Sequence, residues 1–383
     1  MNDNVLIIGN GFDLYHRLPT RYTDFLKFKE YWHVFNKLYK KQGSTTNLFD
    51  VRLTENGELL CETMEDFAEK GTYEQEKIDY LNVNLEKNIW INYFLKYPIS
   101  EYGWVDFENE IKNALVAFDR FIFGTLKKRE ADRPPLHSGN RKTYSKLLMF
   151  IDDNTRILEK LATSVCSRSE LTEEVFNDAW ANLIKKMSEE LENLERCLEL
   201  YLELFVSRIK MDTYSNQIAN LNYKYVLNFN YTDTHIKNPN YKDNKIVHYV
   251  HGQIKKKNII LGIGKDEIND KKCVEFEKWY QRINNNTGET YNEWIPKQLT
   301  ALEDTPIKVY IMGHSLAIND KEILGDFFES DLVCEITIFY REGDKPNDLI
   351  KNLNILYGTD FIIDNKKSGR IKFQELEKAV KFD

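Results

Sequence analysis

Residues 5–13 read Val5-Leu6-Ile7-Ile8-Gly9-Asn10-Gly11-Phe12-Asp13, in which four consecutive apolar residues run directly into a turn with two glycines. An apolar run of this length is typical of a strand that is buried on both faces of a parallel sheet. From about Arg21 to Lys40, apolar and aromatic residues recur at three- and four-residue steps, which predicts an amphipathic helix. A strand, a glycine turn and a helix in this order predict the first unit of an α/β fold.

The same alternation of strand and helix patterns returns after residue 220. The expected strands are Tyr225 to Leu227, Ile246 to Val250, Ile259 to Leu261, Ile307 to Met312, Glu335 to Phe339 and Phe361 to Ile363. Helical patterns follow near Asn319 to Glu329 and near Pro346 to Tyr357. Because strands that alternate with helices form parallel sheets covered on both faces, we predict an α/β fold with a mostly parallel, Rossmann-like sheet. The first strand is expected to join this later sheet.

Residues 44–220, between these two parts, show mainly helical periodicity. One apolar stripe consists of Ile111, Leu115, Phe118 and Ile122. The longest predicted helix runs from about Glu173 to Lys210, and its near-heptad stripe consists of Leu183, Met187, Leu191, Leu194, Leu198, Tyr201 and Phe205. Such a stripe needs a partner, in the same chain or in a second copy, and we expect a homo-oligomer. The expected domains are a split α/β domain, residues 1–43 and 221–383, and a mainly helical insertion, residues 44–220.

The composition argues against several classes of protein. The 383 residues are 42% apolar and 30% charged, as in folded soluble proteins, and no apolar run approaches the ~20 residues of a membrane span. The net charge of −8 argues against a broad basic face for nucleic acid. The five cysteines have no zinc-ligand spacing, so we expect reduced thiols and no metal site. No signal-peptide pattern is present, and we expect a cytoplasmic location.

The first candidate site is the turn Gly9-Asn10-Gly11-Phe12-Asp13. Where a buried strand ends and a helix begins, backbone N–H groups and the helix dipole favour a ligand phosphate. Leu14 occupies the third glycine position of the usual dinucleotide fingerprint, so a simple strand-ending turn is the alternative interpretation.

The second candidate site is the polar cluster that follows the strand predicted at Tyr225 to Leu227. Ligands of open α/β sheets bind beyond the carboxyl ends of strands, where Asn228, Asn230 and Thr232 could reach ribose or amide groups. The alternative is that these side chains cap the next segment of chain, as Asn and Thr often do.

The third candidate site is the pair His251-Gly252, at the end of another predicted strand. A histidine in this position is well placed for proton transfer near neutral pH. His248 is expected on the opposite face of the strand, and we interpret it as a structural histidine.

The fourth candidate site is Gly313-His314-Ser315, which at first resembles the nucleophile elbow of an α/β-hydrolase. That fold places its catalytic histidine after the serine, whereas His314 is the last histidine of this chain, and Ala317 replaces the final glycine of the motif. We therefore interpret this segment as a second strand-end turn that lines the same nucleotide site.

Taken in order, the four motifs resemble the AbiH family. They read Gly-Asn-Gly-Phe-Asp, Asn-Phe-Asn-Tyr-Thr, His-Gly, and Gly-His-Ser-Leu followed by Asp320. The most specific part of the resemblance runs from Ile7 to Phe25, and Trp104-Val105-Asp106-Phe107-Glu108 resembles a further family segment. The resemblance implies a bacterial protein of bacteriophage abortive infection whose phage trigger is unknown.

The same order of motifs is more distantly similar to the sirtuin-like superfamily, which implies a sirtuin-like sheet that binds NAD. By this resemblance Gly9 and Gly11 approach the phosphates, Gly313 and Ser315 support the adenosine half, Asn230 orients the nicotinamide ribose or a water, and His251 is the general base. The other residues expected to contact the nucleotide are Asn10, Phe12, Asp13, Asn228, Thr232, Gly252 and His314. No zinc-ribbon cysteines are present, so the resemblance does not extend to a deacylase module.

Two functional hypotheses follow. The first is an NAD glycohydrolase that breaks the nicotinamide–ribose bond during infection, with Asn230 and His251 as catalytic residues and NAD as the substrate. The alternative is a sensor or assembly protein that binds a nucleotide without consuming it, for which the turn glycines matter and His251 does not. A nuclease is disfavoured because the sequence has no clustered motif of carboxylates and lysine and is acidic overall.

Overall fold

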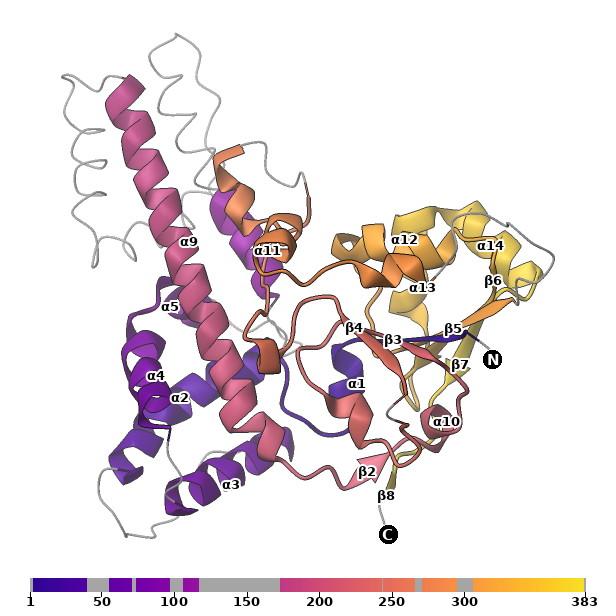
Figure 1. Ribbon diagram of the computed structural model, residues 1–383, viewed down its shortest axis with the longest axis horizontal. Coiled ribbons are helices and arrows are strands. Elements are labelled where there is room, and N and C mark those ends of the chain that lie inside the picture. Colours follow the sequence, from indigo (N-terminus) through magenta and orange to yellow (C-terminus); the bar gives the residue numbers. More distant parts are fainter. Residues whose placement is uncertain are drawn as a thin grey trace. The chain divides into compact units, whose positions relative to one another are not determined.

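The computed structural model describes residues 3–39, 55–70, 74–96, 106–116, 173–242, 244–265, 271–294 and 306–381. The chain divides into two compact units, and the elements that make them up are labelled in Figure 1. The first consists of residues 1–71, 201–260 and 282–383, and the second of residues 72–200 and 261–281. The helical residues up to 71, which follow the first strand, thus belong to the same unit as the sheet. The domain boundaries expected at residues 43 and 220 stay a prediction.

A six-stranded parallel sheet, in the order β4-β3-β1-β5-β6-β7, forms the centre of the first unit. Its strands are β1 (Val5–Ile8), β3 (Tyr225–Asn228), β4 (Ile246–Tyr249), β5 (Ile307–Met312), β6 (Val333–Tyr340) and β7 (Ile371–Glu375). Strand β1 pairs with β3 on one side and with β5 on the other, in a register that sets Val5 beside Tyr225 and Val309. The parallel sheet, and the place of the first strand within it, are therefore confirmed.

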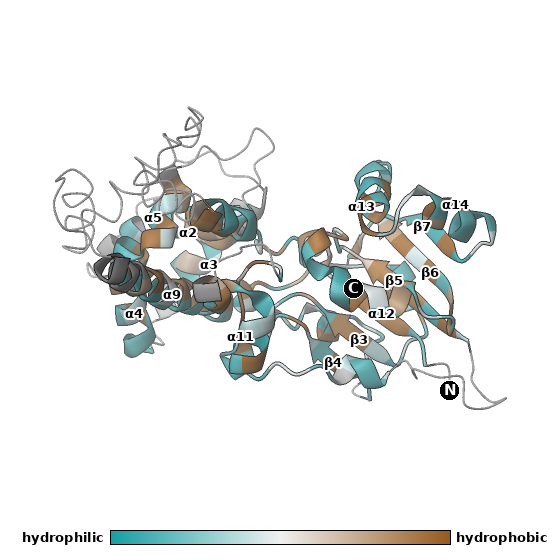
Figure 2. Ribbon diagram, turned by 90° about the horizontal axis from the view of Figure 1, so that it is seen from above, coloured by the Kyte–Doolittle hydropathy of each residue, from teal (hydrophilic) through white to brown (hydrophobic). Residues whose placement is uncertain are grey.

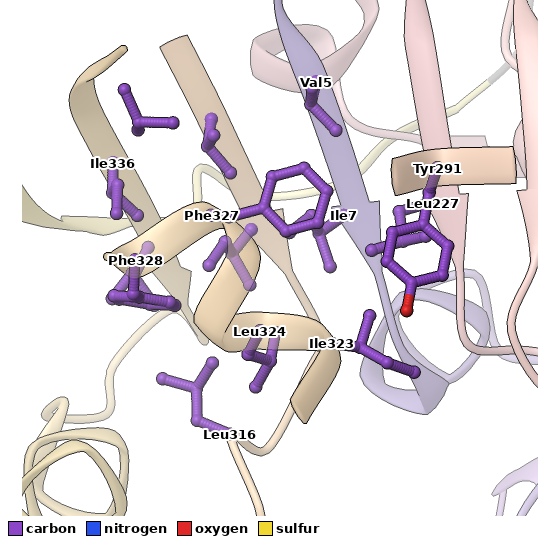
Figure 3. Packing of buried hydrophobic residues seen from close by; sticks show 14 of the residues in the cluster. Val5, Ile7, Leu227, Tyr291, Leu316, Ile323, Leu324, Phe327, Phe328 and Ile336 are labelled. Carbon is purple, nitrogen blue, oxygen red and sulfur yellow. The ribbon is translucent and has the colours of Figure 1, made fainter. Parts of the chain in front are cut away.

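Apolar side chains cover both faces of the sheet, as the apolar run of β1 predicts. Val5 and Ile7 point into one cluster together with Leu324 and Phe327 of helix α12 (Lys321–Phe328) (Figure 3). Leu6 and Ile8, which alternate with them along the strand, lie in a second cluster with Phe12 and Ile218. Figure 2 shows the strands largely in the brown of hydrophobic residues. Burial on both faces explains why this strand carries no alternation of polar and apolar residues.

The remaining elements of the first unit are short helices, two longer helices and a small second sheet. The α-helices are α1 (Asn10–Tyr15), α2 (Tyr22–Tyr39), α3 (Glu55–Lys70), α10 (Asn216–Ala219), α13 (Asn347–Tyr357) and α14 (Thr359–Lys367). The 3₁₀ helices are η1 (Val206–Arg208), η2 (Thr234–Lys237), η3 (Ile254–Lys256), η5 (Thr290–Glu293) and η6 (Ile318–Asp320). Strands β2 (Thr213–Tyr214) and β8 (Val380–Lys381) pair antiparallel.

Two of the expected strands are wrong. Phe361 to Ile363 lie in helix α14, from which Phe361 and Ile362 pack against the core of the sheet. Three apolar residues in a row have no period, so they cannot distinguish a strand from one side of a helix. Ile259 to Leu261 form no strand either, although Ile260 donates a backbone hydrogen bond to the carbonyl of His251 over 3.0 Å. The sixth strand is β7, a mostly exposed edge strand that the apolar pattern did not indicate.

The long helix α9 (Glu173–Leu204) confirms the helix predicted over Glu173 to Lys210, although it ends six residues earlier. All seven residues of its predicted heptad stripe are buried within this chain: Leu183, Met187, Leu191, Leu194, Leu198, Tyr201 and Phe205. Near its end, the ring centroids of Tyr201 and Phe205 lie 4.8 and 4.9 Å from that of Phe28 on α2. The stripe therefore has its partners in the same chain, and self-association stays a prediction without support from this helix.

The second unit contains α4 (Gln75–Lys87), α5 (Ile89–Lys96), a helix over residues 107–116, the first part of α9, η4 (Lys271–Phe276) and the start of α11 (Lys278–Asn284). Trp90 of α5 donates from Nε1 to the carbonyl of Met187 on α9 over 2.9 Å. The expected helical stripe is buried at Ile111 and Leu115, whereas Phe118 and Ile122 lie outside the described residues. Within the described residues, no helix is long and apolar enough to cross a membrane.

The second unit also contains the segment Asp106 to Glu108, which was singled out from the sequence. The Asp106 carboxylate accepts a hydrogen bond from the backbone N–H of Asn109 over 3.1 Å and thereby caps the helix. Phe107 stacks on Phe94 with ring centroids 4.1 Å apart, and Glu108 pairs with the buried Lys278 over 2.8 Å. These three residues therefore anchor a helix, and Trp104 and Val105 lie outside the described residues.

Two turns meet backbone to backbone at the carboxyl ends of β1 and β5. Gly11 donates its N–H to the carbonyl of Gly313 over 2.8 Å, and Gly9 donates to the carbonyl of Met312 over 3.1 Å. A Cβ atom would lie 2.8 Å from the Gly313 oxygen at position 9, 2.7 Å from the Gly313 Cα at position 11, and 2.1 Å from the Phe12 nitrogen at position 313. Glycine at these three positions is thus what lets the two turns touch.

We predict that Gly313→Ala destabilises the protein more than Gly343→Ala. Both glycines have a positive φ, of 70° and 75°, so alanine costs about 1–2 kcal/mol at either position. A Cβ at 343 meets none of the described residues within 4 Å, whereas at 313 it overlaps the α1 backbone, which adds about 1–3 kcal/mol. Unfolding free energies from chemical denaturation measure the difference, and equal losses in the two variants would contradict the proposed close contact.

Candidate functional site

The four predicted motifs lie at the carboxyl ends of four neighbouring strands. The Gly9 to Asp13 turn follows β1, and the Asn228 to Thr232 segment begins at the last residue of β3. His251 follows β4, and Gly313 with His314 follows β5. In the sheet these strands stand in the order β4-β3-β1-β5. Because the strands are parallel, the fold brings segments that are far apart in the sequence to one edge of the sheet.

Two asparagines hold the loop after β3 and connect it to the turn after β1. The Asn228 side chain accepts from the N–H of Asn230 over 2.8 Å and donates to the carbonyl of Thr232 over 2.9 Å. Asn230 donates from Nδ2 to the carbonyl of Gly9 over 3.0 Å. Asn228 is fully buried and both ends of its amide serve the loop, as the capping interpretation describes, whereas Asn230 lies where the two turns meet.

Asp13 of α1 is a buried carboxyl group beneath this loop. Its Oδ2 accepts a hydrogen bond from Thr232 Oγ1 over 2.6 Å, and its Oδ1 has no hydrogen-bond partner among the described residues. Burial raises the pKa of Asp13 from 3.8 to about 6, although hydrogen bonds from Thr232 and Thr234 and the charge of Lys237 act in the opposite direction. A titratable group with a pKa near neutral therefore lies next to the predicted catalytic asparagine.

The turn after β1 uses several of its backbone donors within the fold. Gly9 and Gly11 donate to β5 and to its turn, and Phe12 donates its N–H to the carbonyl of Gly9 over 2.8 Å. The Phe12 ring belongs to the apolar core on one face of the sheet. Asn10 is exposed, and its Oδ1 accepts a hydrogen bond from Thr20 over 2.6 Å. Of the predicted contact residues in this turn, Asn10 is therefore the one whose side chain reaches solvent.

His251 lies two residues beyond β4, with its Nε2 atom 3.5 Å from Oδ1 of Asp320. Gly252 beside it has a φ of 77°, and a Cβ there would lie 2.0 Å from the carbonyl oxygen of Asn258. The Phe229 ring meets the imidazole edge to face, with centroids 5.5 Å apart. The position of His251 is therefore fixed by its backbone and by two neighbouring side chains.

His314, beyond β5, faces the same carboxylate. Its Nε2 atom lies 3.4 Å from Oδ2 of Asp320, and its Nδ1 atom accepts a hydrogen bond from the N–H of Leu316 over 2.9 Å. The centroids of the Phe229 and His314 rings lie 4.2 Å apart. Ser315 is exposed, and its carbonyl accepts a hydrogen bond from Asn352 over 2.7 Å. The structure thus brings His251 and His314 together around one acidic side chain.

Asp320 is a residue of this site to which sequence reasoning gave no role. It is 8% exposed and directly precedes α12. The available signal was its position, since it follows a strand-end turn and precedes a helix, but a single aspartate there is also a common helix cap. No group of three or more His, Cys, Asp or Glu side chains in the described part of the chain could hold a metal ion.

We predict that the titration of Asp13 makes the protein less stable as the pH rises. Its folded pKa of about 6 exceeds the unfolded value of 3.8, so the folded state binds the proton more tightly. The contribution to stability is fully present below about pH 4 and is lost as the pH rises through 6, by up to about 3 kcal/mol. Asp13→Asn keeps an acceptor for Thr232 and does not titrate.

The measurement is the difference in unfolding free energy between the wild type and Asp13→Asn at pH 4.5 and at pH 7.5. The wild type should lose stability relative to the variant at the higher pH. Parallel pH dependence of the two proteins would show that Asp13 does not titrate in this range.

Comparison with known proteins places the chain in a family. No curated protein and no solved structure matches it. A family model described as "Bacteriophage abortive infection AbiH" matches residues 5–341, a span that contains all four strand-end motifs together with Asp320. Because the match covers most of the sequence, the chain belongs to the AbiH family of bacteriophage abortive-infection proteins.

Proposed function

We propose that this AbiH protein acts in phage defence by hydrolysing NAD at the bond between nicotinamide and ribose. The family implies the role in abortive infection. Numbered along the chain, the six strands of the sheet stand in the order 3-2-1-4-5-6, which is also the order of the dinucleotide-binding Rossmann fold. Such sheets bind ligands beyond the carboxyl ends of the strands where the order reverses, which here is at β1 and β5.

The observation that carries the proposal is the meeting of His251, Asp320 and the Asn230 loop at this edge. A histidine beside a carboxylate is a suitable general base, because the anion stabilises the imidazolium that forms when the ring accepts a proton. The His251 and Asn230 side chains belong to residues that are 7% and 6% exposed. Such burial strengthens the electrostatic interactions of the two side chains, because little water screens them.

The reaction would run as follows. The bond between ribose C1′ and the nicotinamide nitrogen breaks, and its electron pair stays on that nitrogen, which neutralises the pyridinium. Water, oriented by Asn230, adds to C1′ of the oxocarbenium-like ribose, and His251 accepts the proton that this water loses. The products are nicotinamide and ADP-ribose, with the proton held first on His251 and then released to solvent.

A second candidate function is a nucleotide sensor that binds without cleavage, and specific contacts favour it. The N–H groups of Gly9, Gly11 and Phe12 already donate to backbone carbonyls, and the Asn230 amide donates to Gly9. These contacts connect two turns of the sheet, so a ligand that displaced them would change how the turns pack. In this case the turn glycines matter for binding and His251 does not.

We predict that infection lowers total NAD in cells that express the wild type but not in cells that express His251→Gln. Glutamine can still hydrogen-bond but cannot accept the proton, and loss of a general base slows catalysis by about 100-fold or more. Asn230→Ala should behave like His251→Gln. The matched control is His248→Gln on the same stretch of chain, because His248 is also buried and packs against Tyr291, with ring centroids 5.1 Å apart.

Total NAD is measured before and during phage challenge, together with survival of the culture and the melting temperature of each purified variant. NAD loss in the wild type and in His248→Gln alone supports the proposed reaction and its residues. Protection from phage with unchanged NAD overturns hydrolysis in favour of the sensor. NAD loss that persists in both His251→Gln and Asn230→Ala overturns the assignment of the catalytic residues.

A further inference from the structure

One buried carboxylate, that of Asp320, faces two histidines from two different strand ends. His251 Nε2 lies 3.5 Å from Oδ1, and His314 Nε2 lies 3.4 Å from Oδ2. The two imidazoles also share the Phe229 ring, which both meet edge to face. Each carboxylate oxygen therefore lies near Nε2 of one histidine, at the ends of β4 and β5 and the start of α12.

The two histidines differ in what their other contacts allow. Because Nδ1 of His314 accepts the N–H of Leu316 over 2.9 Å, that nitrogen carries no proton. The nitrogen of His314 that can carry a proton is therefore Nε2, which faces Asp320. Leu316 has a φ of 58°, an uncommon conformation for leucine. His314 thus acts as a fixed donor to the carboxylate.

His251 is held in place by its backbone, since its carbonyl accepts the N–H of Ile260 over 3.0 Å and Gly252 makes the turn that follows. With Oδ2 engaged by His314, Oδ1 faces Nε2 of His251. A proton on that nitrogen would lie beside a negative charge in a buried site, where charge interactions are screened little. The next charged residues on the same helix, Lys321 and Glu322, are exposed.

We infer that Asp320 is the positioning residue of this site and that His314 fixes its carboxylate. Asp320 orients the His251 ring and stabilises the imidazolium that forms when His251 accepts the proton from the attacking water. The use of this proton rests on the proposed hydrolysis of NAD. The effect of Asp320 on His251 and the tautomer of His314 can both be measured without a substrate.

The test is an NMR titration of the histidine side chains in the full chain, with the His251 signals assigned from the His251→Gln spectrum. Asp320→Asn should lower the pKa of His251 by about one unit, a tenfold weaker binding of the proton, because an opposite charge within this distance shifts a pKa by at least that amount. Asp320→Glu, which keeps the charge, should restore most of the shift. The matched control is Asp326→Asn on the same helix, where the residue is exposed, and it should leave the titration of His251 unchanged.

The imidazole nitrogen shifts of the wild type alone provide a measurement that needs no substitution at Asp320. They should show the proton of His314 on Nε2 rather than on Nδ1. A proton on Nδ1 of His314, or equal pKa values for His251 in the wild type and in folded Asp320→Asn, overturns the inference.

Kinetics separates this inference from the proposed function. If NAD is hydrolysed, Asp320→Asn should lower kcat by about 10-fold or more with little change in KM, and should move the acidic limb of the pH profile to lower pH. A shifted His251 titration without any hydrolysis of NAD retains the inference and overturns the function. Hydrolysis of NAD together with a His251 titration that Asp320→Asn leaves unshifted retains the function and overturns the inference.

Discussion

The backbone contact between the turns after β1 and β5 is the constraint on which the rest of the site depends. Three glycines meet there, and a Cβ on any one of them would lie within 2.8 Å of the opposite turn. The contact fixes the turn after β5, in which His314 directly follows Gly313 and faces Asp320. It also fixes the turn after β1, in which the carbonyl of Gly9 accepts a hydrogen bond from the Asn230 amide. One steric condition therefore aligns the loops of three strands at the same edge.

This condition also shows where sequence reasoning reaches its limit. The apolar run of β1 was predictable, because a strand buried on both faces must be apolar throughout. The two glycines after β1 were predictable as sites of close approach, but a ligand phosphate and another backbone both require the absence of a Cβ. The sequence alone cannot tell whether the glycines approach a ligand phosphate or another backbone segment. Asp320 was missed for a related reason. Its neighbours His251 and His314 follow two different strands, β4 and β5, and only the folded sheet shows that the ends of these strands lie close together.

The helical part of the chain shows the same limit at longer range. The apolar spacing of α9 correctly predicted a long helix with one buried stripe, because spacing reports which face is apolar. It does not report what covers that face. Tyr201 is an example of how the face is covered. Its ring packs on Phe28, and its hydroxyl donates to the carbonyl of Pro19 over 2.6 Å. These partners lie near the start of the sequence.

Unfavourable features of the fold gather at the edge of the sheet where the family motifs lie. Asp13 buries a carboxyl group at the cost of a raised pKa, and Leu316 adopts a positive φ. Such costs persist only where surrounding contacts enforce them, and they concentrate at functional sites. A core that served only stability could replace Asp13 and Thr232 with apolar residues of similar volume. Their presence beneath Asn230, together with a carboxylate shared by two histidines, argues that this edge was selected for chemistry or binding rather than for packing.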